Sequence, residues 1–236
     1  SPTRRGRPTV MSLLGGRASV LLGDYWLVKA IDNVLVNKTS SSEVIKVFSR
    51  TLADLAEGEI LQLQKADLGD TAENDYYRII FNKTASLFVT SAESAAISVS
   101  ASAEKMKAMK SYAEYLGIAF QIRDDIFDYE ENPDTGKPVG LDLKEKKITL
   151  PLLGALKNAS EEEAKDIRRK VCRIDEHPEW QKEIVEFVHR NGGLEYARKR
   201  LYEYVERAKL SLRPLGKSED ADKLADIAEF TADRKS

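Results

Sequence analysis

The chain has 236 residues, of which 42% are hydrophobic and 32% are charged, and its formal net charge is −2. This length and composition are typical of a globular domain with a substantial core, and the near-neutral charge excludes a general electrostatic attraction to nucleic acid. On that ground we expect no nucleic-acid partner. No apolar run reaches the roughly 18–20 residues that cross a bilayer, so we expect no integral membrane segment either. The single cysteine, Cys172, excludes an intramolecular disulfide and predicts a cytoplasmic protein.

Helical periodicity runs through the whole chain, and alternating strand patterns are hard to find. Helix-end signals support this pattern, because Ser160 precedes a first turn of three glutamates and Asn191-Gly192-Gly193 closes another periodic segment. The sequence therefore predicts a single all-α domain over residues 1–236. The helices are expected at residues 18–36, 42–64, 75–100, 103–129, 150–158, 161–173, 179–190, 194–212 and 221–232.

Three acids lie close together near the end of the expected helix 103–129. Asp124 and Asp128 stack one turn apart and Asp125 stands beside them, because an α-helix has 3.6 residues per turn. Like charges at this spacing destabilise a helix by a few tenths of a kcal/mol per pair, and a bound cation would reverse that penalty. Mg²⁺ typically takes one or two such carboxylates together with water and phosphate oxygens. The alternative is an ordinary solvated acidic face.

The other residues of this helix favour a cavity over a solvated face. Gly117 and Gln121 share the stripe of the three aspartates, whereas the opposite arc is apolar. A solvated face would mix charges of both signs, but this stripe holds glycine, glutamine and acids alone. The sequence therefore predicts that the stripe lines a polar cavity.

A loop rich in proline, glycine and aspartate, residues 131–140, follows the acidic helix. It contains Lys137, and Asp142 and Lys147 follow before the next expected helix. Lysines on a flexible loop beside a metal-binding carboxylate cluster suit the remaining oxygens of a diphosphate. The alternative is an ordinary basic connector.

These segments together resemble the trans-isoprenyl diphosphate synthases, the polyprenyl synthetase family. The matching segments, in family order, are residues 4–9, 23–25, 57–62, 83–85, 117–128 and 136–151. The resemblance implies an isoprenoid-synthase-type helical bundle around a central cavity. It also implies a homodimeric enzyme of isoprenoid biosynthesis that joins an allylic diphosphate head-to-tail (1′-4) to isopentenyl diphosphate, giving a longer trans-polyprenyl diphosphate.

The resemblance also implies roles for individual residues. Asp124, Asp125 and Asp128 would hold Mg²⁺, up to three ions bridged by the substrate diphosphate. Lys83, Thr84 and Gln121 would be catalytic, with the Thr84 carbonyl and Gln121 presenting dipoles to the developing allylic cation. The basic residues that would bind the diphosphates are Arg4, Lys83, Lys137 and Lys147 for the allylic substrate and Arg5 for isopentenyl diphosphate.

One departure from the family pattern concerns the start of the chain. In the family, a first aspartate-rich motif precedes the paired arginines by a few residues, and Arg4 and Arg5 lie at the very beginning here. We therefore expect an N-terminally incomplete domain that is inactive as a 236-residue chain alone. The alternatives are a class I terpene cyclase, against which the paired arginines and the lysine loop argue, and a non-catalytic subunit of a heteromeric prenyl diphosphate synthase, against which the intact aspartates argue.

Overall fold

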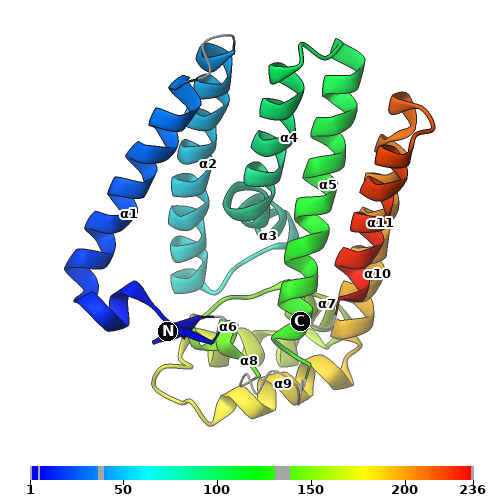
Figure 1. The fold of residues 1–236 in the computed structure, drawn as a ribbon. Coiled ribbons are helices and arrows are strands. Elements are labelled where there is room, and N and C mark those ends of the chain that lie inside the picture. Colours follow the sequence, from blue (N-terminus) through cyan, green and yellow to red (C-terminus); the bar gives the residue numbers. More distant parts are fainter. Residues whose placement is uncertain (1, 5, 37–39, 131–138, 235–236) are drawn as a thin grey trace. The chain divides into compact units, whose positions relative to one another are not determined.

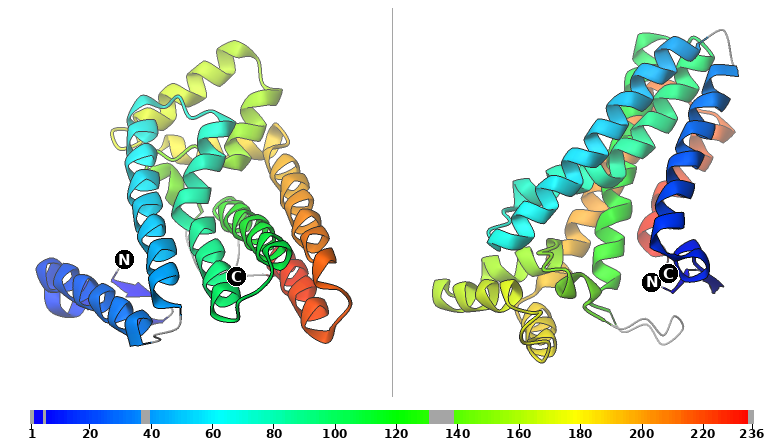
Figure 2. Two further views of the ribbon diagram at one scale, coloured as in Figure 1. Left: turned by 90° about the horizontal axis from the view of Figure 1, so that it is seen from above. Right: turned by 90° about the vertical axis from the view of Figure 1, so that its left-hand side faces the viewer.

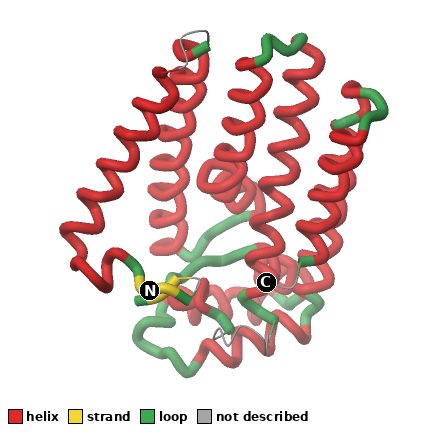
Figure 3. Tube along the Cα trace, viewed as in Figure 1, coloured by secondary structure: helices red, strands yellow, loops and turns green. Residues whose placement is uncertain are grey.

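The computed structural model describes residues 2–4, 6–36, 40–130 and 139–234. Helices account for almost all regular structure in these ranges, which confirms the all-α prediction (Figures 1 and 3). The strands described are β1 (Thr3–Arg4) and β2 (Arg7–Pro8), which form a two-residue antiparallel ribbon. The chain divides into two compact units, residues 1–49 and 50–236.

The first unit contains the ribbon, α1 (Val10–Val36) and the first residues of α2 (Ser41–Leu68). α1 begins eight residues before its expected start and bends at Gly15, whose φ of 81° lies outside the helical region. None of the α1 side chains is buried. Large apolar side chains are exposed along the helix, among them Met11, Leu13, Leu14, Val20, Leu21 and Trp26. Large apolar side chains exposed in such number are a common mark of an interaction surface.

The second unit contains the remainder of α2 and every later element of the described chain. These elements are α3 (Glu73–Ile80), the π-helix η1 (Phe81–Ala85), α4 (Ser86–Ser98), α5 (Ala103–Phe127), α6 (Leu141–Lys144), α7 (Leu150–Asn158), α8 (Glu161–Cys172), α9 (Trp180–Arg190), α10 (Gly193–Ser211), the 3₁₀ turn η2 (Arg213–Leu215) and α11 (Glu219–Asp233). Most helix boundaries lie within a few residues of those predicted. The expected helix 75–100 is instead divided into α3, η1 and α4.

α5 packs against α4 on one side and α10 and α11 on the other, as the view from above in Figure 2 shows. Leu116, Ala119, Ile122 and Ile126 of α5 are buried in the core, which confirms the predicted apolar arc. Burying a side chain the size of leucine or isoleucine stabilises a fold by about 1.5–3 kcal/mol. This packing fixes the polar stripe of α5 on the side that faces α3, η1 and α6.

Candidate active site

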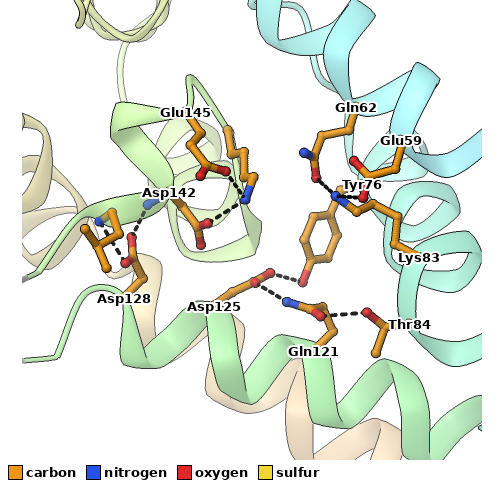
Figure 4. A network of polar contacts seen from close by, with 12 residues as sticks. Glu59, Gln62, Tyr76, Lys83, Thr84, Gln121, Asp125, Asp128, Asp142 and Glu145 are labelled. Carbon is orange, nitrogen blue, oxygen red and sulfur yellow. Dashed lines mark hydrogen bonds and ion pairs between the residues drawn. The ribbon is translucent and has the colours of Figure 1, made fainter. Parts of the chain in front are cut away.

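The polar stripe of α5 faces a pocket of about 220 Å³ in the second unit. Its wall is built from α2, α3, η1, α5 and the segment from α6 to α7. The lining residues are Gln62, Lys65, Ala66, Thr71, Tyr76, Ile79, Ile80, Lys83, Thr84, Gln121, Asp125, Asp142 and Lys146–Thr149. Five predicted site residues therefore meet here, namely Lys83, Thr84, Gln121, Asp125 and Lys147. Figure 4 shows the first four of them.

Two glycines allow neighbouring helices to approach η1, which carries Lys83 and Thr84. A Cβ at Gly58 of α2 would lie 2.8 Å from the Lys83 side chain, and one at Gly117 of α5 would lie 2.6 Å from Ala85 Cα. π-helical turns are rare in proteins as a whole, but those that occur are frequently found at functional sites. Gly117 was expected to line the cavity, but it is not among the lining residues, because its missing side chain serves the close packing of α5 on η1.

Lys83 is held at the pocket by two residues of α2. Its Nζ donates to Gln62 Oε1 at 2.8 Å and forms an ion pair with Glu59 at 3.0 Å. The Glu59 side chain is exposed, so an incoming anion can displace it from Lys83 at little cost.

Asp125 is almost completely buried, with 3% of its surface exposed. It accepts a hydrogen bond from the Tyr76 hydroxyl at 2.6 Å and another from Gln121 Nε2 at 2.9 Å. Gln121 in turn accepts from the Thr84 hydroxyl at 2.8 Å. Burial and the neighbouring charge of Asp142 raise the pKa of Asp125 to about 8, although both hydrogen bonds oppose this shift.

Asp142 and Lys147 form the opposite wall of the pocket. Lys147 Nζ lies 3.1 Å from Asp142 and 2.6 Å from Glu145. Burial lowers the pKa of Lys147, but these two carboxylates outweigh burial and leave the pKa raised. Lys147 is therefore a fully charged ammonium group at neutral pH.

Asp128 fixes the position of Asp142 from outside the pocket lining. Its carboxylate accepts hydrogen bonds from the backbone N–H groups of Leu141 and Asp142, at 2.8 and 3.0 Å, at the start of α6. Burial and the charge of Asp142 raise the pKa of Asp128 to about 6. Figure 4 shows Asp128 directed toward this backbone, whereas Asp125 is directed toward Tyr76 and Gln121.

Asp124 forms an ion pair with Arg234 and is also absent from the pocket lining. The three aspartates therefore do not converge on one point, and no group of three or more acidic, histidine or cysteine side chains in the described part of the chain is arranged to hold a metal ion. Their role as a metal-binding set stays a prediction. The carboxylates that do share the pocket are Asp125 and Asp142.

Three further residues were predicted to bind substrate, namely Arg4, Arg5 and Lys137. Arg5 and Lys137 lie outside the described residues, and Arg4 belongs to β1 in the first unit. Their assignment stays a prediction.

Three residues that contribute to this network had no predicted site role, namely Gln62, Tyr76 and Asp142. Gln62 and Asp142 each lie inside a segment that had been singled out, and Tyr76 lies two helical turns before Lys83. Helical spacing from Lys83 was thus the one signal that pointed to Tyr76.

Comparison with known proteins assigns the chain to a family. The model of the family described as polyprenyl synthetase matches residues 1–188. An all-trans-nonaprenyl-diphosphate synthase (geranyl-diphosphate specific) of Rhodobacter capsulatus is 37% identical over 235 residues, covering 99% of this chain and 71% of that protein. The chain belongs to the polyprenyl synthetase family. It is a trans-prenyltransferase of isoprenoid biosynthesis, which confirms the predicted family and enzyme class and disfavours the terpene cyclase.

Solved structures in this family share the fold. The crystal structure of a decaprenyl diphosphate synthase from Rhodobacter capsulatus matches with a TM-score of 0.90 and 32% identity, and that of a polyprenyl synthase from Caulobacter crescentus CB15 complexed with calcium and isoprenyl diphosphate matches with a TM-score of 0.89 and 32% identity. Each match covers 100% of this chain and 72% of the solved chain. No helix within the described ranges has the length and apolar character needed to span a membrane.

Proposed function

We propose that this protein joins an allylic diphosphate to isopentenyl diphosphate, and that the pocket around Asp125 binds the diphosphate end of the allylic substrate. The observation that carries the proposal is the pairing of opposite charges across one small pocket. Lys83 and Lys147 offer ammonium groups to phosphate oxygens, while Asp125 and Asp142 offer carboxylates to a divalent cation. A diphosphate with its metal ion needs both kinds of group.

The residues of the pocket fit Mg²⁺ as the cofactor. Asp125 is buried, and both hydrogen bonds described for it come from neutral groups, so a divalent cation would supply the missing positive charge. Two carboxylates suffice for an ion that takes its other ligands from phosphate and water. The Caulobacter crescentus structure, whose complex contains calcium, is consistent with a divalent cation. When bound, Mg²⁺ neutralises charge on the departing diphosphate. Asp124 and Asp128 remain proposed metal ligands. To bind the metal, Asp124 would first release Arg234, and Asp128 would first release the backbone N–H groups at the start of α6.

The remaining groups bind and orient the allylic substrate. Lys83 and Lys147 hold the phosphate oxygens and keep the diphosphate at one end of the pocket. The Gln121 side-chain oxygen and the Thr84 carbonyl present negative dipole ends to the carbon that becomes positive as the diphosphate leaves. Ile79 and Ile80 line the same pocket and exclude water from that carbon. We propose Arg4, Arg5 and Lys137 as further diphosphate ligands.

Two relatives, both of Rhodobacter capsulatus, are named nonaprenyl and decaprenyl diphosphate synthase, and on those two names we propose a long-chain product. We also propose a cytoplasmic homodimer. The exposed apolar side chains of α1 support self-association, and the lone Cys172 supports a reducing compartment.

The proposal is tested by incubating the complete gene product with radiolabelled isopentenyl diphosphate, farnesyl diphosphate and Mg²⁺, followed by chromatography of the products. The expected result is a series of longer prenyl diphosphates whose formation stops in excess chelator. A cyclic hydrocarbon without incorporated label would indicate the terpene cyclase instead. Absence of any product with correctly folded protein would indicate a non-catalytic subunit.

A further inference from the structure

A continuous chain of hydrogen bonds connects α3 and η1 to α5 at the wall of the pocket. The Tyr76 hydroxyl donates to Asp125 Oδ2 at 2.6 Å, Gln121 Nε2 donates to Asp125 Oδ1 at 2.9 Å, and the Thr84 hydroxyl donates to Gln121 Oε1 at 2.8 Å. Figure 4 shows these four side chains in a row, with Tyr76 reaching down to Asp125 and Thr84 at the other end. Each carboxylate oxygen of Asp125 therefore has one donor.

The backbone of both elements is suited to this arrangement. Gln121 and Asp125 are four residues apart on α5 and so lie on one face. Tyr76 and Thr84 are eight residues apart. In a regular α-helix, eight residues would leave their side chains pointing roughly 80° apart around the helix axis. The wider turn of η1 reduces the rotation per residue, which brings Thr84 back toward the face of Tyr76. The π-helical segment therefore lets both ends of the hydrogen-bond chain meet α5.

The orientation of the Gln121 amide depends on this network. With its nitrogen toward Asp125, the amide directs its oxygen to the Thr84 hydroxyl. When Asp125 is ionised, as it is when it binds a cation, the reversed amide would place its oxygen against the carboxylate, where two acceptors would face each other. Asp125 thus selects one orientation of Gln121, and Tyr76 is the donor that holds the other oxygen of Asp125.

We propose that Tyr76 is a positioning residue of this active site, whose hydroxyl sets the orientation of the Asp125 carboxylate toward the bound metal–diphosphate and, through Asp125, the orientation of the Gln121 amide. Both Tyr76 and Asp125 are 3% exposed, so water does not replace this donor. Tyr76 also lines the pocket, but the inference concerns its hydroxyl group and not its ring. It rests on the proposed function, since it assigns Asp125 to the metal–diphosphate.

The structure provides a matched control for the loss of one buried tyrosine hydroxyl. Tyr112 is also 3% exposed, and its hydroxyl donates to the Leu224 carbonyl at 2.7 Å, away from the pocket lining. Tyr76→Phe and Tyr112→Phe each remove one hydrogen bond of similar length from the interior of the same unit. A purely structural role predicts the same behaviour for both variants.

The test measures binding of Mn²⁺ together with inorganic pyrophosphate to the complete gene product by titration calorimetry. Removing a group that orients a metal ligand typically costs 10–100-fold in affinity or activity, so we expect Tyr76→Phe to weaken binding about 10-fold and Tyr112→Phe to leave it within about 2-fold of the unsubstituted protein. In turnover assays, Tyr76→Phe should raise the KM for the allylic diphosphate by a similar factor and lower kcat as well, whereas Tyr112→Phe should change neither. Equal binding by both variants would overturn the role of Tyr76, whereas absence of binding by the unsubstituted protein would overturn the proposed function as well.

A second measurement needs no substitution and remains decisive if Tyr76→Phe does not fold. Buried tyrosine hydroxyl protons exchange slowly enough to be followed by NMR. Addition of Mg²⁺ and pyrophosphate should shift the hydroxyl resonance of Tyr76 and leave that of Tyr112 in place. A Tyr76 resonance that stays unchanged at saturation would contradict the proposal.

Discussion

Arg234, at the end of α11, pairs with Asp124 of α5 although 110 residues separate them in the sequence. The Arg234 guanidinium also lies 4.2 Å from the Phe120 ring centroid and donates to the Phe120 carbonyl at 3.2 Å. Arg123 donates two N–H groups to the Arg234 carbonyl, at 3.2 and 2.8 Å. The end of α11 is therefore fastened to α5 beside the aspartates of the candidate site.

Replacing Arg234 with alanine should destabilise the second unit by about 1–2 kcal/mol, because it removes a partly buried ion pair and a stacked cation from α5. Urea denaturation followed by circular dichroism measures this loss. Arg169→Ala is the control, since Arg169 forms an exposed pair with Asp166 within α8 and its loss should cost about 0–1 kcal/mol. Equal losses for the two variants would show that the contact between Arg234 and Asp124 does not stabilise the fold.

Asp125 should make the metal-free protein sensitive to pH. Burial and Asp142 raise its pKa from 3.8 to about 8, so between these values the folded protein keeps a proton that the unfolded chain has lost. The stability contributed by this proton is complete below about pH 4 and is lost as the pH rises toward 8. In chelator, we expect the melting temperature to fall between pH 5 and 8.5, and Asp125→Asn to reduce that fall. The exposed control is Asp220→Asn. If the melting temperature of Asp125→Asn falls with pH as steeply as that of this control, the assignment is refuted.

Gly117→Ala should displace α5 from η1. The new Cβ would lie 2.6 Å from Ala85 Cα, and a backbone atom cannot move aside as a side chain can. We expect a loss of about 1–3 kcal/mol in stability, together with reduced turnover, because η1 carries Lys83 and Thr84. Gly23→Ala in α1 is the control. It meets no atom within 4 Å and should be neutral or stabilising by up to about 1 kcal/mol, since alanine favours a helix. Equal melting temperatures would contradict the close approach.

The sequence predicted those features that depend on local periodicity. The helical periodicity of α5 put Gln121 and Asp125 on a polar stripe and Ile122 and Ile126 on the opposite apolar arc. The structure places the first pair at the pocket and the second pair in the core. The same periodicity grouped Asp124 and Asp128 with Asp125. It did not reveal which partner each side chain meets. Asp124 meets Arg234 and Asp128 meets the α6 backbone, and both contacts depend on the tertiary fold. The π-helical turn η1 was likewise missed, because residues 81–85 fit an α-helical pattern as well.

Lys83→Ala should weaken binding of the allylic substrate more than it slows the chemical step. Lys83 reaches the pocket from η1 and is held by Gln62 and Glu59, so its loss removes a positioned cation from the diphosphate end. We expect the KM for the allylic diphosphate to rise about 10-fold or more, since a hydrogen bond to a charged group contributes about 1.5–3 kcal/mol. Steady-state kinetics with the allylic substrate varied measure this. An unchanged KM would remove Lys83 from the binding site, and the exposed Lys223→Ala should leave it unchanged.

The most direct test of the active-site assignment is the Mg²⁺-dependent incorporation of labelled isopentenyl diphosphate by the complete gene product with Asp125 replaced by alanine. If the pocket around Asp125 holds the metal–diphosphate, kcat/KM should fall about 100-fold or more while Asp220→Ala stays at the unsubstituted value. Circular dichroism of both variants verifies that the fold is retained. A folded Asp125→Ala protein with kcat/KM within about 3-fold of the unsubstituted enzyme would contradict the assignment of this pocket as the active site.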